Sequence, residues 1–287
     1  MTTLHSQLAQ RGWYSQDPSA LHDEITEYLE PVSNVPTQRP SAIIVPHAGY
    51  RYSGQIAASA FHHCKGFDFD RIFVVGPSHH YPLKNEASVL DADAFVTPLG
   101  TTEIDREIVK EMLKHPLCHS IEDLHEEEHS VQVELPFLQH VAPDSPVVPI
   151  ILGECDNDHI EEMSKLIKPF LSDKSLMVIS TEFTHYGKEF GYTPFAEQVA
   201  ANIKALDIKA CRYIASADTR SFGQFIDQTH SNICGRDAIR LLMQCFDEDQ
   251  QQAGALLDYA RSGDMTADYS HSVSYASMLF EGPWAAA

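Results

Sequence analysis

The chain has 287 residues, of which 43% are hydrophobic, and this is enough for a full core in one large domain or two small ones. Its formal net charge is −21 with only 20 Lys and Arg residues, which argues against nucleic acid and anionic membranes as partners, because both need a basic surface. No apolar run approaches the roughly 18–20 residues of a membrane span and the N-terminus has no signal-peptide pattern, so we expect a cytoplasmic protein.

The predicted elements alternate between strands and helices over most of the chain. An irregular stretch to residue 18 precedes a helix from about Ser19 to Glu30, and a polar, proline-rich connector follows over residues 32–40. The order predicts a single α/β domain over residues 1–287, with a largely parallel sheet covered on both faces. Strands are predicted at 41–45, 71–75, 86–90, 94–96, 147–152, 176–180 and 269–280. The further helices are predicted at 53–64 (capped by Ser53), 105–114, 158–171, 194–206, 207–215, 222–230, 233–246 and 252–261.

Three of the predicted strands share one feature: a histidine follows soon after each of them. The carboxyl ends of parallel strands meet at one edge of an open sheet, where such folds place their ligand crevice. If the three strands are neighbours, their histidines should therefore lie close together. The strands and their histidines are 41–45 with His47, 71–75 with His79, and 176–180 with His185.

A thiol completes the candidate metal-ligand set. Cys234 lies just before a predicted helix, and a helix N-terminus stabilises the thiolate that binds metal. Neutral imidazole is the commonest metal ligand, and thiolate suits iron, copper and zinc. His47, His79 and Cys234 together can form a three-ligand site with open positions. Taken singly, each is more often an ordinary hydrogen-bonded histidine or a buried thiol, and we expect the other five cysteines to be reduced core or surface thiols.

Four further residues are candidates for the surroundings of this site. The acidic run before Ser130 predicts a solvated helix start, but His129 borders the apolar segment 131–138 and can point inward. His80 cannot share a pocket with its neighbour His79, so we expect it to make a supporting contact. Trp13 and Tyr14 either line a ligand site or pack against the body of the protein.

Six ordered blocks of the sequence resemble the Memo family, in register from about Gly12 to Ala276. Memo proteins are similar in fold to the class III extradiol ring-cleaving dioxygenases, so the resemblance implies an α/β/α sandwich over one metal pocket. The blocks are Pro46–Tyr50, Gly76–His80, Glu128–Ser130 with Leu135-Pro136, Thr181–Gly187, Ile233–Arg236 and Ser272–Ala276.

The resemblance also implies roles for individual residues. It suggests a mononuclear non-haem iron or copper ion on His47, His79 and Cys234, with His129 and His185 as catalytic pocket histidines. In the ring-cleaving relatives the counterpart of His185 is the acid–base catalyst. Human-like members have been linked to copper-dependent redox activity, cell motility and the binding of phosphotyrosine peptides, with Trp13 and Tyr14 at the matching pocket mouth.

Two positions depart from the patterns of these relatives. The familiar animal pattern has Asp where this chain has Glu182, and the longer carboxylate can reach the metal or crowd the pocket. The thiolate of Cys234 replaces the carboxylate ligand of the dioxygenases, and a thiolate can be oxidised by the chemistry it supports.

These observations leave three functional hypotheses. The first is an iron- or copper-dependent oxidoreductase, dioxygenase-like, acting on a small-molecule substrate. The alternative is a non-catalytic interaction module that binds peptides or phosphopeptides through a vestigial pocket, with Trp13 and Tyr14 near Arg51 and Arg236; the strong negative charge counts against it. The third is zinc-dependent hydrolysis, because two His and one Cys with an open position is also a catalytic zinc pattern.

Overall fold

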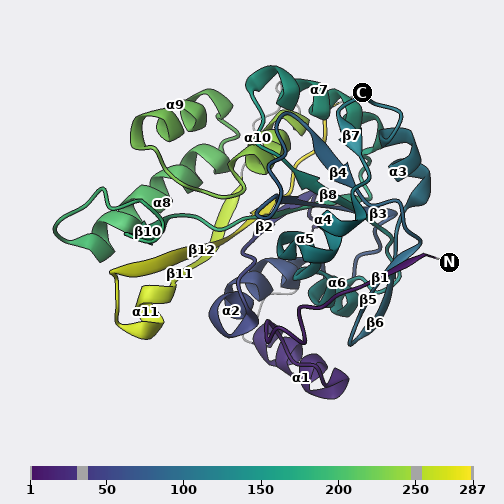
Figure 1. The fold of residues 1–287 in the computed structure, drawn as a ribbon, viewed down its shortest axis with the longest axis horizontal. Helices are drawn as coiled ribbons and strands as arrows, with labels where there is room; N and C mark the ends of the chain where they lie inside the picture. The colour runs from purple at the N-terminus through teal and green to yellow at the C-terminus, as the bar shows by residue number, and fades with distance from the viewer. Residues whose placement is uncertain (1, 31–37, 247–253, 286–287) are drawn as a thin grey trace.

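The computed structural model describes residues 2–30, 38–246 and 254–285 (Figure 1). The strands within these ranges are β1 (Thr3–His5), β2 (Ala42–Val45), β3 (Arg71–Pro77), β4 (Ala87–Val89), β5 (Ala94–Thr97), β6 (Gly100–Glu103), β7 (Cys118–His119), β8 (Val147–Leu152), β9 (Ser175–Ser180), β10 (His185–Gly187), β11 (Ala255–Arg261) and β12 (His271–Phe280). The helices are α1 (Pro18–Leu29), α2 (Tyr50–Phe61), α3 (Arg106–Met112), α4 (Glu122–Glu127), α5 (His129–Gln132), α6 (Leu135–Val141), α7 (Asn157–Ile167), α8 (Val199–Ala215), α9 (Thr219–Thr229), α10 (Arg236–Cys245) and α11 (Ser262–Thr266), with 3-10 turns at His62–Cys64 and Lys168–Phe170.

A large mixed sheet forms the centre of the molecule, in the order β10-β12-β2-β9-β3-β8-β4-β7, with β11 paired to β12. Its four middle strands, β2, β9, β3 and β8, are mutually parallel. These strands are short apolar runs buried along nearly their whole length, as parallel strands covered on both faces require. A separate small sheet joins β1, β5 and β6.

Helices cover both faces of the large sheet, which confirms the predicted α/β architecture. Figure 1 shows α7 and α10 on one side of the central strands and α2, α5 and α6 on the other. One continuous cluster of buried side chains links the strands to both layers. No helix of the described segments is long and apolar enough to cross a membrane.

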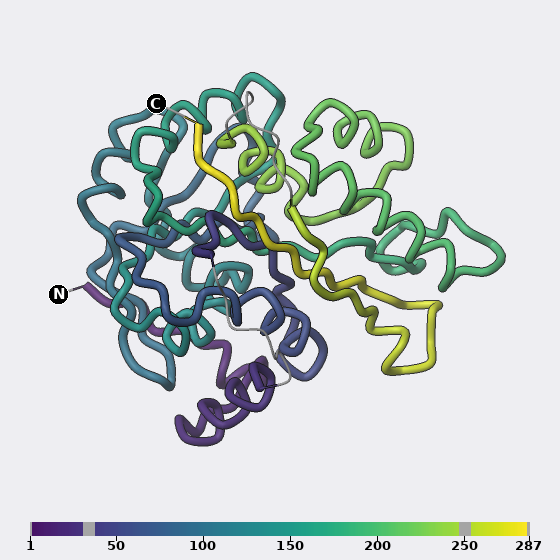
Figure 2. The backbone as a smooth tube through the Cα atoms, turned by 180° about the vertical axis from the view of Figure 1, so that it is seen from behind, coloured from purple at the N-terminus to yellow at the C-terminus, as the bar shows by residue number. Residues whose placement is uncertain are grey.

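The predicted helix at 252–261 is wrong where the structure describes it, since residues 255–261 form strand β11. Figure 2 shows β11 and β12 as a long hairpin that extends from the body beside α8. β11 is half-buried along its length and pairs antiparallel with β12. Pairing with a partner strand decides the conformation here, and local helix propensity does not reveal that partner. Residues 252 and 253 lie outside the described part of the chain.

The two helices predicted at 194–206 and 207–215 are one helix, α8, which begins only at Val199. Asp207 lies in its middle and is buried. Its carboxylate accepts hydrogen bonds from the Thr184 N–H and hydroxyl and from the Tyr259 hydroxyl. Asp disfavours helices because its carboxylate can hydrogen-bond to nearby backbone groups in place of the helical hydrogen bonds. Here the distant partners Thr184 and Tyr259 occupy the carboxylate, so it does not compete.

Two smaller expectations also differ from the structure, and a third is mostly outside the described residues. Helix α2 begins at Tyr50, and the Ser53 hydroxyl donates to the Ala48 carbonyl within the first turn, so Ser53 is not the cap. The N-terminal stretch, expected to be irregular, contributes strand β1 to the small sheet. Residues 32–37 of the predicted connector at 32–40 lie outside the described part of the chain.

The strand order places the candidate residues at one edge of the sheet. β2, β9 and β3 are parallel neighbours in that order, as the spacing of the three histidines required. His47, Glu182 and His79 therefore leave the sheet from adjacent strand ends, and His185 begins the following strand β10. Cys234 reaches the same edge from the turn that precedes α10.

Candidate metal centre

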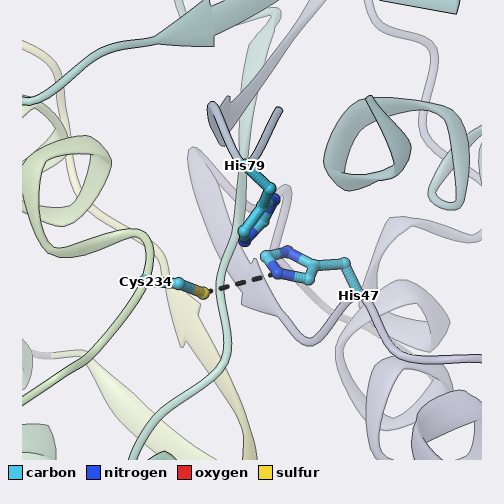
Figure 3. Close-up of side chains that lie close together, drawn as sticks. All are labelled: His47, His79 and Cys234. Atoms are coloured by element: carbon cyan, nitrogen blue, oxygen red, sulfur yellow. Dashed lines mark hydrogen bonds between the residues drawn. The ribbon is translucent and has the colours of Figure 1, made fainter. Parts of the chain in front are cut away.

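The side chains of His47, His79 and Cys234 point toward one another (Figure 3). One nitrogen of each ring and the sulfur all lie within 4.8 Å of one another, and Cys234 Sγ is 3.4 Å from His47 Nε2. The two imidazole rings meet edge to face, with their centroids 5.1 Å apart. Two nitrogens and one sulfur that converge from separate elements are the donor set of a transition-metal site.

A buried relay fixes the orientation of His47. Its Nδ1 lies 2.8 Å from Ser180 Oγ, whose hydroxyl donates to Glu134 Oε1 at 2.9 Å. Because the serine proton is committed to Glu134, Ser180 Oγ accepts from Nδ1–H, and the Nε2 lone pair faces Cys234. Burial, with His129, His79 and His185 nearby, holds the pKa of His47 well below its ordinary value, so the ring is neutral, as a ligand must be.

Glu134 is wholly enclosed, and burial raises the pKa of its carboxyl group well above the ordinary value. The hydrogen bond from Ser180 opposes that rise, and the charge of Glu182 adds to it. Burial therefore favours the uncharged carboxylic acid form of Glu134.

His79 is held by a different carboxylate, that of Glu128. Glu128 Oε2 accepts the backbone N–H of His79 at 2.6 Å, and Oε1 lies 2.9 Å from the ring Nδ1. A carboxylate on Nδ1 leaves Nε2 as the free ligand atom. Burial lowers the pKa of His79, but hydrogen bonds with Cys234 and Glu128 outweigh it and raise the pKa to about 10. The same anionic surroundings favour a bound cation.

Backbone contacts hold the sulfur of Cys234. The Glu182 N–H donates to Sγ at 3.2 Å, and the Gly235 N–H donates to the Thr181 hydroxyl at 2.9 Å. A Cβ at Gly235 would lie 2.5 Å from the Thr181 side chain, so only glycine allows this approach. An N–H donor stabilises the thiolate, the form that binds metal. All six cysteines are free thiols, and Cys234 is the one that is not buried.

His129 forms one wall of the site. Its ring stacks on His79 with centroids 4.6 Å apart, and Trp13 lies against it at the same separation. Burial, which outweighs the charge of Glu128, lowers the pKa of His129 to about 4, so the ring is neutral. His80 is exposed, and the centroid of its ring is 6.2 Å from that of His129.

Glu182 and His185 form a second pair of side chains beside Cys234. Glu182 Oε2 is 3.1 Å from His185 Nε2 and 3.9 Å from His47 Nε2. The ring Nδ1 of His185 lies 2.9 Å from the Phe183 carbonyl. Burial lowers the pKa of His185, but Glu182 and Cys234 more than compensate and raise it to about 9. The Glu182 carboxylate thus lies between two histidines.

Tyr14 differs from its expected place at a pocket mouth. Its side chain is buried, its hydroxyl lies 3.0 Å from Ser6 Oγ, and its ring packs against Tyr50. Trp13 is half-buried and alone of the pair contacts a site histidine. Arg51 lies over the ring of Tyr52, and Arg236 pairs with Glu154.

Sequence reasoning missed the three residues that orient the histidines. Glu128 belongs to an acidic run that predicts a solvated helix start, yet its side chain is fully buried. Glu134 is the lone charge within the apolar segment 131–138, and that isolation was an available signal of a buried carboxyl group. Ser180 carried no signal, because its role depends on two residues distant in the sequence.

The fold and this centre define a class: an α/β protein with a candidate two-histidine, one-cysteine metal centre at the carboxyl edge of a parallel sheet. The sequence profile of the family described as Memo-like protein matches residues 8–279. Protein MEMO1 of Homo sapiens and of Rattus norvegicus are each 32% identical to this chain over 280 residues, which is 93% of both lengths. Protein memo-1 homolog of Caenorhabditis elegans is 28% identical over 95% of this chain and 81% of its own. The chain belongs to the Memo family.

Proposed function

We propose that this protein binds one iron or copper ion through His47 Nε2, His79 Nε2 and Cys234 Sγ and is a redox enzyme for a small-molecule substrate. The observation that carries the proposal is the convergence of these donors within 4.8 Å. Both rings have their second nitrogen engaged, by Ser180 and by Glu128, so their free nitrogens are already oriented. Zinc, whose catalytic sites also use His and Cys ligands, is the less favoured metal.

A bound iron or copper ion would supply one-electron chemistry and the capacity to activate dioxygen. The chain's own residues supply the rest. His185, with Glu182 at 3.1 Å, can hold or release a proton at Nε2 beside the sulfur. His129 is neutral and stacks on His79, and with Trp13 it keeps water from that side of the ring.

Elemental analysis of anaerobically prepared protein tests the proposal. We expect about one iron or copper per chain in the wild type and a loss of at least tenfold in Cys234→Ser. Cys211→Ser, on α8 and away from the centre, is the matched control and should keep its metal. Oxygen consumption by the same samples tests redox activity. A chain that holds no transition metal, or a Cys234→Ser variant with unchanged metal content, contradicts the proposal, and zinc alone would favour hydrolysis.

The alternative, a peptide-binding module, has weaker support. It needs an exposed aromatic and basic surface at the pocket, but Tyr14 is buried and Arg236 is paired with Glu154. Titration with a phosphotyrosine peptide and its unphosphorylated counterpart distinguishes the two functions. Equal affinities for both peptides would remove the phosphate-specific version.

A further inference from the structure

A small pocket reaches two of the three candidate metal ligands, and we call it the entry pocket. Residues at the ends of β3 and β8 and at the start of α10 line it, namely 77–79, 152–154 and 232–238. His79 and Cys234 belong to this lining, whereas His47 is fully buried. The side chain of Glu154 is 81% exposed, so it marks the end of the pocket that faces solvent. The entry pocket therefore joins the surface to two ligand side chains.

The size of the entry pocket limits what it admits. Its volume is about 220 Å³. Pockets that enclose a drug-sized ligand have volumes of roughly 300–1,000 Å³, and a water molecule takes up about 30 Å³ of the liquid. The entry pocket therefore suits a molecule of only a few heavy atoms. Apolar side chains form part of its wall, namely Pro77, Leu152, Ile233 and Ala238.

The uncharged polar side chains of the entry pocket are already engaged with the protein. Asn232 uses both ends of its amide on His185: Oδ1 accepts the backbone N–H at 3.0 Å, and Nδ2 donates to the carbonyl at 2.8 Å. The Ser78 hydroxyl donates to the Tyr81 carbonyl at 2.6 Å. These groups hold the walls in place, so they are not available to bind an incoming molecule.

The charged side chains of the entry pocket also have partners. Asp237 Oδ1 lies 2.6 Å from Arg240 Nη1, and Arg236 Nη2 lies 3.2 Å from Glu154 Oε1. Two carboxylates and one guanidinium line the pocket, and each is paired. An ion that entered would lose its hydration without gaining a free counter-charge, which is costly. The walls therefore favour an uncharged molecule.

An exposed ion pair stands where the entry pocket meets a larger cavity beside α9. Glu154, Arg236 and Asp237 line both spaces. Glu154 lies just past the end of β8, and Arg236 begins α10, so their ion pair links two walls of the pocket. Exposed pairs of this kind are weak, so this pair can separate without disturbing the fold. While it is intact, the Arg236 side chain narrows the opening.

We propose that the entry pocket is the route by which a small uncharged molecule reaches His79 and Cys234, and that Arg236, held by Glu154, sets its size limit. Dioxygen and hydrogen peroxide both meet the limits of size and charge. That such a molecule is the oxidant of the metal centre rests on the proposed function. The route itself is a property of the fold, because Cys234 lies at its inner end.

Alkylation of Cys234 in the full chain after chelation tests the route. Iodoacetamide is small and uncharged, iodoacetate is small and anionic, and N-ethylmaleimide is larger and uncharged. Each rate is divided by the rate of the same reagent with the Cys234 peptide of the urea-unfolded chain, followed by mass spectrometry. The thiolate fraction is common to all three reagents and cancels when these ratios are compared. We expect the ratio for iodoacetamide to exceed the other two roughly tenfold.

Two variants of Arg236 separate size from charge. Arg236→Ala removes the side chain, whereas Arg236→Gln keeps a polar side chain without the charge. We expect the N-ethylmaleimide ratio to rise roughly tenfold in Arg236→Ala and less than about threefold in Arg236→Gln. Trp13→Ala, which opens the wall beside His129, and Arg212→Gln, on the exposed face of α8, are the controls and should leave all three ratios unchanged.

The outcomes separate this proposal from the proposed function. The route is refuted if iodoacetamide does not modify Cys234, if Arg236→Ala leaves the N-ethylmaleimide ratio unchanged, or if Trp13→Ala raises it instead. Equal ratios for iodoacetamide and iodoacetate refute the preference for an uncharged molecule. Arg236→Ala should keep its metal in elemental analysis. A chain that holds no metal but shows the expected alkylation pattern overturns the proposed function alone.

Discussion

The carboxylate of Glu128 holds His79 at two points, its backbone N–H at 2.6 Å and its ring Nδ1 at 2.9 Å. His79 lies just beyond Ser78, past the end of β3, where the backbone is no longer part of the sheet. The two contacts therefore determine both where the ring starts and how it turns. Glu128 also caps α5 by accepting the Ser130 N–H, so one buried side chain ties a helix start to a ligand.

Replacement of Glu128 tests this arrangement. In Glu128→Gln one side-chain oxygen becomes an amide donor, which cannot accept a proton from His79 N–H or Nδ1–H. We expect metal affinity to fall about 10–100-fold, as loss of such an orienting partner usually causes. Competition with a chelator measures it. Glu127→Gln, its exposed neighbour, is the control, and an equal effect in both variants would assign the loss to general charge.

The relay behind His47 makes a prediction about charge. Because burial raises the pKa of Glu134 well above its ordinary value, the side chain is a neutral acid at pH 5, and an amide imitates it. Glu134→Gln should therefore stay within about 1 kcal/mol of wild-type stability at this pH, whereas Glu134→Ala should lose about 2–4 kcal/mol by leaving a cavity and an unpaired Ser180. Denaturant unfolding at pH 5 compares them.

The same carboxyl group has a pH signature. The pKa of Glu134 is higher in the folded chain than in the unfolded chain, so its contribution to stability is fully present below pH 4.5. This contribution is lost as the pH rises toward the pKa of the folded state. Glu134→Gln lacks this titration, so its stability relative to the wild type should improve from pH 5 to pH 8. An unchanged difference across that range would mean that Glu134 is ionised in the fold.

Gly235 tests the position of Cys234 without removing a ligand. An added Cβ would meet the Thr181 side chain at 2.5 Å and the Ser180 carbonyl at 3.0 Å, so the turn before α10 must move. Gly235→Ala should lower metal affinity at least tenfold, since small displacements of a ligand are costly. In the control Gly223→Ala the new methyl group meets open space, so metal content should persist and stability should rise by about 0.5–1 kcal/mol. Metal content and denaturant unfolding of both variants are the measurements.

His125 predicts a loss of stability in mild acid. It is buried on α4, neither of its ring nitrogens has a well-formed hydrogen bond to any of the described residues, and burial lowers its pKa to about 3. The unfolded chain takes up a proton near pH 6.5 and the folded chain does not, so stability falls as the pH drops below 6.5. His125→Leu removes this effect.

The expected size follows from the two pKa values. Between pH 8 and pH 5 the wild type should lose about 2 kcal/mol more than His125→Leu, because each unit is worth about 1.4 kcal/mol. Urea unfolding of metal-free protein at both pH values measures the difference. The exposed His119→Gln serves as control, and a variant that loses as much as the wild type would contradict the prediction.

Local sequence patterns were sufficient for the frame of the molecule. The apolar runs at β2, β3, β8 and β9 and the helices between them predicted a parallel sheet, and the residues after three strand ends predicted which side chains would meet. Both succeed because strand burial and strand direction follow from short-range periodicity and alternation. The clustering of His47, His79 and Cys234 at one edge is a consequence of that frame.

Tertiary contacts alone decided the rest. The sequence of β11 by itself does not show that this segment pairs with β12. Asp207 is accommodated in a helix because Thr184 and Tyr259 hydrogen-bond to its carboxylate. In the sequence Glu128 resembles its solvated neighbours, and only the folded structure shows that it is buried against His79. Ser180 likewise acquires its role only from its position between His47 and Glu134. Burial and hydrogen bonding depend on residues brought together from far apart in the chain, so no local pattern can reveal them.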